Sequence, residues 1–154
     1  MLLATRSASL EPAIVRAVGL EVAEDLEQVV VLVPEQLAGE TIENLRASSR
    51  VAITMARTYD HRTFQLKADC LDVSLAGEAH RALAEGYRSA FAGQLEMVGI
   101  PRRITTRVRV WPCLALRLRV TDVFAQTPGP GAGERWHPFS DALEAGRGTR
   151  ETLG

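Results

Sequence analysis

The stretch that decides the fold is RTFQLKADCLDV, residues 62–73. Apolar and polar side chains alternate along it with a period of two, which is the spacing of a β-strand with one buried face. One face carries Phe64, Leu66, Ala68 and Cys70, and the other carries Thr63, Gln65, Lys67 and Asp69. The pattern therefore predicts a strand that separates a hydrophobic core from an exposed polar surface.

Seven further segments have the periodicity of regular structure. Strands are predicted where Val, Ile and Leu dominate, at 10–22, 28–33, 50–56, 105–110 and 114–123, and helices where apolar residues recur every three or four positions, at 35–48 and 77–98. In the first strand, Gly19 indicates a bulge or the close approach of another element. Because most strands follow one another in sequence, with the first two forming a hairpin, we expect a mainly β protein: an antiparallel barrel or sheet with peripheral helices.

The C-terminal region has different signals. Residues 126–133, QTPGPGAG, combine prolines and glycines and predict a structured turn. Residues 134–143 predict a short final element that begins at Ser140 or Asp141 as an N-terminal cap. Since no repeat or break in composition is visible, we expect a single domain over residues 1–144 and a flexible tail over residues 145–154.

Composition narrows the class of protein. The chain has 154 residues, of which 46% are hydrophobic and 24% charged, as in an ordinary folded domain. A net charge of −1 gives no field that would attract nucleic acid, and the arginine-bearing strands lack interleaved aromatics. Apolar runs are far shorter than the ~20 residues of a membrane-spanning helix, and no secretory signal is visible, so a cytoplasmic protein without membrane contact is expected. Cys70 and Cys113 lack metal-site spacing and are predicted to be buried free thiols, with no metal bound.

The polar face of residues 62–67 is the first candidate site. Thr63, Gln65 and Lys67 place a hydroxyl, an amide and a cation on one surface, and Lys67 is the only lysine in the chain. Phosphate groups need charge-assisted donors, whereas a flavin ring needs amide-type partners at its heterocyclic edge. Arg62 and Arg16 could complete a phosphate clamp. The alternatives are a solvated sheet face and arginines that only cover apolar surface.

Several segments, taken in order, resemble the FMN-binding split barrel of the pyridoxamine 5′-phosphate oxidase-like superfamily. They are PAIVRAVG (12–19), VVVLVPE (29–35), IENLRASSRVAIT (42–54), HRTFQLKA (61–68) and QTPGPGAG (126–133). The resemblance implies a six-stranded antiparallel split barrel that forms a homodimer, with FMN in clefts between the subunits. It makes Arg16 a phosphate contact and puts Thr63 where the full-length oxidases place a glutamine contact, with Gln65 and Lys67 on the same face.

The chain departs from the full-length oxidases at three places. A basic residue late in the first strand, a Tyr-Thr pair after the second and an Arg-Lys pair opening the first helix are replaced by Gly19-Leu20, Leu32-Val33 and residues 37–40. Two hypotheses fit these observations. The first is a dimeric FMN-binding flavoprotein, an oxidoreductase of unassigned substrate and catalytic residues, with Arg16, Arg62, Thr63, Gln65 and Lys67 as cofactor contacts. The alternative is a non-enzymatic split-barrel module that binds a small ligand or only dimerises; deazaflavin F420 and haem are less favoured ligands.

Overall fold

The computed structural model describes residues 1–105 and 107–136. The strands are β1 (Leu2–Arg6), β2 (Pro12–Arg16), β3 (Gly19–Val22), β4 (Gln28–Pro34), β5 (Arg50–Ala56), β6 (Thr63–Leu75) and β7 (Cys113–Ala125). The helices are a 3-10 turn (Glu35–Leu37), α1 (Gly39–Ala47), α2 (Glu78–Met97) and the short α3 (Arg102–Thr105). None of the helices in these ranges is both long and apolar enough to cross a lipid bilayer.

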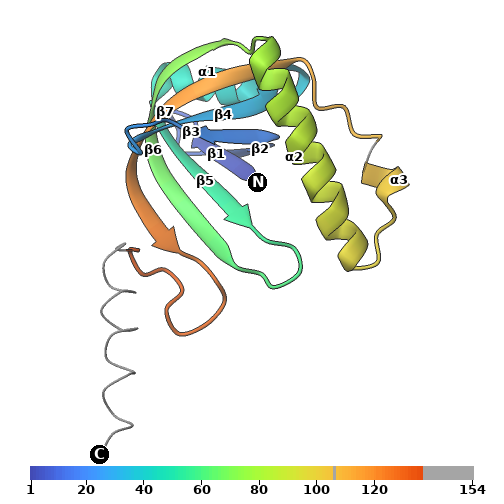
Figure 1. Cartoon of the computed structure of the whole chain (residues 1–154). Coiled ribbons are helices and arrows are strands. Elements are labelled where there is room, and N and C mark those ends of the chain that lie inside the picture. Colours follow the sequence, from blue (N-terminus) through green and yellow to red (C-terminus); the bar gives the residue numbers. More distant parts are fainter. Residues whose placement is uncertain (106, 137–154) are drawn as a thin grey trace, which may run out of the picture.

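All the strands belong to one curled sheet with the order β2-β1-β5-β6-β7-β4-β3, and every pairing is antiparallel. Figure 1 shows α2 lying alongside the curled sheet and α1 at one end of it. The predicted fold class, mainly β with peripheral helices in a split-barrel arrangement, is confirmed. The number of strands differs from the expected six, because seven are present in the described residues.

The extra strand comes from a bend in the predicted strand 10–22. Its two halves, β2 and β3, lie at opposite edges of the sheet and are joined by Ala17 and Val18. The Ala17 N–H donates to the Met1 carbonyl at 3.2 Å, and the Val18 N–H donates to the Leu32 carbonyl at 2.8 Å. The bend therefore brings the two edges of the sheet together, and the sheet curls around its apolar face.

Two other strand predictions need correction. Residues 2–6 form β1, between β2 and β5, although LLATR was not predicted as a strand because it is short and shows little alternation. The strand predicted at 105–110 is wrong: α3 ends at Thr105, and residues 107–110 form no strand. Its neighbour along the chain, β7, already has β6 and β4 on its two sides, so the alternating segment has no free partner there.

The remaining predictions agree with the described residues. The 35–48 and 77–98 segments contain α1 and α2, and α2 is followed by Gly99 at a φ of +88°. The turn at 126–133 is confirmed, with Gly129 and Gly133 at positive φ. Two predictions fall outside the described range, which ends at residue 136. They are the final element at 134–143, most of it including its cap at Ser140 or Asp141, and the tail at 145–154.

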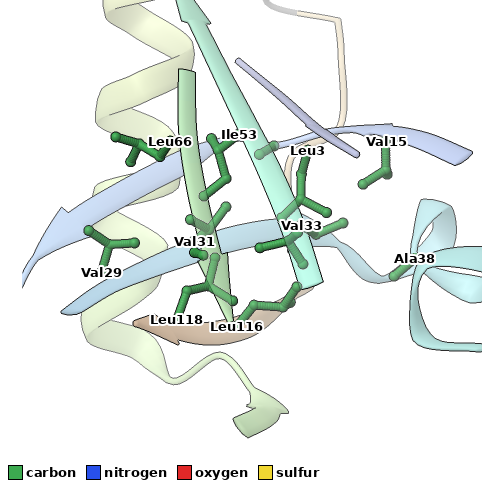
Figure 2. Packing of buried hydrophobic residues seen from close by; sticks show 13 residues of the cluster. Leu3, Val15, Val29, Val31, Val33, Ala38, Ile53, Leu66, Leu116 and Leu118 are labelled. Carbon is green, nitrogen blue, oxygen red and sulfur yellow. The ribbon is translucent and has the colours of Figure 1, made fainter. Parts of the chain in front are cut away.

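The core fills the inside of the curl. Figure 2 shows side chains of strands from both halves of the sheet meeting there, and their residues are almost fully buried: Leu3, Val31, Val33, Ile53, Leu116 and Leu118. These side chains alternate with outward-facing ones along each strand, as the period-two pattern predicts. A second, smaller cluster, which contains Val18, Leu32 and Ala84, joins α2 to the sheet.

Gly19 lies where α2 packs closely against the sheet. A Cβ atom added there would lie 2.9 Å from Leu32 Cδ1 and 3.3 Å from Leu83 Cγ. Leu32 is fully buried, so its side chain has no free space into which to move. The close approach that the sequence indicated at Gly19 is thus present.

We expect Gly19→Ala to destabilise the protein by about 1–3 kcal/mol, because the added methyl overpacks this contact. The matched control is Gly86→Ala on the exposed side of α2, where an added Cβ meets nothing within 4 Å. Removing a glycine from a helix interior should stabilise the protein by about 0.5–1 kcal/mol. Urea denaturation of both variants measures the two free energies of unfolding; equal effects would contradict the packing described here.

Candidate functional site

The outward-facing row that contains Lys67 is set by the register of four strands. Lys67 is paired with Ala52 of β5 and with Asp122 of β7, and Ala52 is paired in turn with Ala4 of β1. Directly paired residues of antiparallel strands have their side chains on the same face of the sheet. Ala4, Ala52, Lys67 and Asp122 therefore form one row across the outer face.

This row is the floor of a groove of about 510 Å³. The groove is hollow at its centre because Ala4 and Ala52 have only methyl side chains, while longer side chains surround them. Its volume is within the range of ~300–1,000 Å³ that is typical of small-molecule sites. The lining residues are Ala4, Thr5, Arg6, Arg50, Val51, Ala52, Lys67, Ala68, Asp69, Thr121 and Asp122.

The charges around the groove favour an anion. Asp69 is engaged by Arg119 at 3.9 Å and by the Ser49 hydroxyl at 3.3 Å, and Asp122 forms an ion pair with Arg135. By contrast, Arg6, Arg50 and Lys67 have no carboxylate partner among the described residues. The two acids of the groove are thus compensated from its rim, and three cations remain for a bound group.

Two local features hold the floor of the groove in place. Thr121 is an extra residue in β7 between the pairs Lys67–Asp122 and Ala68–Val120, and its hydroxyl donates to the Lys67 carbonyl at 3.1 Å. Such a bulge strengthens the local twist of the strand pair. On the β1 side, the buried Asn44 amide of α1 donates to the Thr5 hydroxyl at 3.1 Å and fixes β1 beside the helix.

Gln65 and Arg16 lie on the next row of the same face. Gln65 is paired with Thr54, Thr54 with Leu2, and Leu2 with Arg16. Gln65 Nε2 donates to the Thr54 hydroxyl at 3.2 Å, which fixes the orientation of the amide. Its Oε1 and its second N–H are left for another partner. Both residues flank the groove without lining it.

Thr63 and Arg62 are directed elsewhere. The Thr63 hydroxyl donates to the His61 carbonyl at 2.7 Å, and its N–H donates to the Thr127 hydroxyl at 3.0 Å. The Arg62 guanidinium lies 5.4 Å from the centre of the Phe64 ring and lines a different hollow, beside α2. Of the five predicted contact residues, the structure places Lys67 in the groove, Gln65 and Arg16 beside it, and Thr63 and Arg62 at the far end of β6.

Arg6 and Arg50 are groove residues that the sequence prediction missed. Arg6 belongs to a strand that was not predicted, and Arg50 stands at the start of β5, where pattern alone gave it no role. Both can be recognised as groove residues only from the pairing of β1 with β5 in the register Ala4–Ala52. That pairing brings the ends of the two strands beside Asp69. In the described residues no three His, Cys, Asp or Glu side chains gather as a metal site would require.

With a curled antiparallel sheet and two principal helices, the chain has the architecture of a split barrel. HupZ of Group A Streptococcus superposes with a TM-score of 0.50 at 16% identity, over 86% of this chain and 88% of that one. A putative pyridoxamine 5′-phosphate oxidase from Lactobacillus delbrueckii gives 0.49 at 19% identity, over 80% and 82% of the two chains. An FMN-binding protein from Syntrophomonas wolfei gives 0.49 at 12% identity, over 80% and 74%.

No model of a known protein family matches the chain, and no curated protein matches it in sequence. The likeness to the solved structures is one of fold. The structures of similar fold include one described as a putative pyridoxamine 5′-phosphate oxidase and one described as an FMN-binding protein.

Neither cysteine has the lowered thiol pKa that nucleophilic chemistry requires. Cys113 is buried, its thiol donates to the Val110 carbonyl at 2.7 Å, and burial raises its pKa to about 11. Burial also raises the pKa of Cys70, which is only partly enclosed. Both are free thiols as predicted, but only Cys113 is fully buried. Because the thiolate is the reactive species, neither residue supports a covalent mechanism near neutral pH.

The two thiols should differ in reactivity. In the native protein at pH 8, we expect Ellman's reagent to modify Cys70 slowly and to leave Cys113 unmodified, because Cys113 is both protonated and enclosed. Cys70→Ser should then show no reaction in native buffer and one reactive thiol in denaturant. Rapid modification of Cys113 in the native C70S variant would contradict the packing around β7.

Proposed function

We propose that the groove on the outer face binds FMN. The observation that carries the proposal is the set of three cations, Arg6, Arg50 and Lys67, that lack carboxylate partners in the described chain and surround a floor of two alanines. A phosphate monoester carries close to two negative charges at neutral pH and is best held by charge-assisted hydrogen bonds. The chain's small net charge makes this local concentration of positive charge distinctive.

The neighbouring row fits the ring part of the cofactor. Gln65 is held by Thr54 and presents the rest of its amide on the same face, as a donor and acceptor for a heterocyclic edge. The methyl side chains of Ala4 and Ala52 allow a flat ring to approach the sheet closely. FMN bound here would supply hydride or electron transfer, and the chain's residues would supply binding, orientation and positive charge.

The same face supports a homodimer. Ile14 and Leu2 are 68% and 47% exposed, and their strand pairing puts them on the rows of Lys67 and Gln65 respectively. Large exposed apolar side chains beside a binding groove are typical of an interface. A second subunit on this face would cover them and would close the groove over the cofactor. We therefore propose a homodimeric flavoprotein and, from the chemistry of the cofactor, an oxidoreductase.

The binding test is titration of the purified protein with FMN, followed by quenching of flavin fluorescence. Lys67→Ala and Arg50→Ala should each raise the dissociation constant roughly tenfold or more, as expected for the loss of a hydrogen bond to a charged group. Arg81→Ala is the matched control, because Arg81 is an exposed, ion-paired residue of α2 outside the groove. Riboflavin, which lacks the phosphate, should bind more weakly and should be insensitive to Lys67→Ala.

Three outcomes would overturn the proposal. They are the absence of FMN binding, binding that Lys67→Ala and Arg50→Ala leave unchanged, and preferential binding of F420 or haem in the absorption spectrum. The homodimer is tested separately by sedimentation of Ile14→Glu, which should be monomeric if this face is the interface. A dimer that survives the substitution would place the interface elsewhere.

A further inference from the structure

A second hollow lies between α2 and the end of the β5–β6 hairpin, on the opposite side of the sheet from the groove. It consists of two adjoining parts that share Met55, Ala56 and Gln94. Met55 alternates with the outward-facing Thr54, so its side chain belongs to the inner face. The hollow is therefore independent of the groove, and a ligand could bind in it whether or not the groove holds a flavin.

The deeper part, of about 250 Å³, is lined mainly by apolar and aromatic side chains, and the Met1 ammonium group at its edge donates to the Tyr87 hydroxyl at 2.8 Å. Tyr87 and Phe91 line it from α2 with their rings nearly parallel, at an interplanar angle of 11° and a centroid distance of 6.1 Å. Leu20, Met55 and Met1 line the sheet side. Flat rings and thioethers make favourable contacts with aromatic groups, so this part suits an aromatic ring better than a flexible chain.

The outer part, of about 370 Å³, offers hydrogen-bond donors. Gln94 Oε1 accepts from the Thr58 N–H at 3.1 Å, which leaves the Gln94 amide nitrogen to donate. Arg57 is held by Asp60, whereas Arg62 lies over the Phe64 ring and has no carboxylate partner in the described chain. The mouth of the hollow thus combines a free cation with a fixed amide donor.

We propose that this hollow binds a small aromatic carboxylate. The ring would lie between Met55 and the Tyr87–Phe91 pair, and the carboxylate would accept hydrogen bonds from Arg62 and Gln94 Nε2. An apolar pocket with a few polar groups at its mouth fixes both the position and the orientation of such a ligand. Arg62, which the sequence grouped with the cofactor contacts, has its role in this second site.

The methionines provide a direct test, because the chain has three of them. Met1 and Met55 line the hollow, whereas Met97 is exposed at the end of α2 and lines neither part. We expect 2-naphthoate, added to protein with carbon-13 in the methionine methyl groups, to shift the Met55 and Met1 signals and to leave the Met97 signal in place. Equal shifts at all three, or no shift at Met55, would overturn the proposal.

The role of the carboxylate is tested by substitution and by a neutral analogue. Arg62→Ala should weaken 2-naphthoate binding about tenfold and leave 2-naphthylmethanol binding unchanged, because only the acid uses the cation. Arg62→Lys should retain part of the affinity, and Arg81→Ala should retain all of it. Octanoate binding more tightly than 2-naphthoate would contradict the aromatic specificity.

The outcome is separable from that of the flavin proposal. FMN affinity should be unchanged in Arg62→Ala, and 2-naphthoate affinity should be unchanged in Lys67→Ala. An effect of Lys67→Ala on 2-naphthoate would mean that the two ligands share one site, which would overturn this inference.

Discussion

The bend at Ala17 and Val18 is the constraint on which the rest of the structure depends. Two main-chain hydrogen bonds, to Met1 and to Leu32, hold the two halves of one segment against opposite edges of the sheet. The sheet then curls and encloses an apolar core that a flat sheet of this size would leave exposed. The same closure brings Gly19 under α2 and so determines where the helix lies. The enclosure of the core and the position of the helix are both linked to this one connection.

The strands β5 and β6 serve two sites because their side chains alternate between the faces of the sheet. Ala52 and Lys67 contribute to the cationic groove outside, while Met55 and Phe64 contribute to the aromatic hollow beside α2. Neighbouring residues of these strands belong to different sites. A shift of the strand backbone that alters one site would therefore alter the other as well. Rigid, paired strands also position side chains more accurately than loops do. The arrangement gives a chain with a single sheet two candidate small-molecule sites, one on each face.

The sequence predicted most of this fold, because period-two alternation and helical spacing are strong in residues 62–73 and 77–98. It missed β1, whose five residues carry too little pattern. It also misplaced a strand at 105–110, where alternation is present but the neighbouring strand β7 is already paired on both sides. Among the residues that line the groove, the sequence predicted Lys67, because it lies in the alternating row of polar side chains on residues 63–69. It could not predict Arg6 and Arg50, because their proximity depends on the β1–β5 register, which is a property of the folded sheet. The flavin itself, and the dimer, stay predictions.

The extra residue at Thr121 in β7 has a counterpart. A few residues further along β6, the register between β6 and β7 shifts again between Cys70 and Asp72, and this time the additional residue, Leu71, is in β6. Each irregularity alone would displace one strand against the other by one position. Together they cancel, so that the pairs Leu66–Val123 and Val73–Leu116 belong to the same antiparallel register. Each of the two strands thus contains one inserted residue, and the ends of the pair remain aligned. One strand can be longer by a residue without a shift in register, provided that its partner is lengthened too.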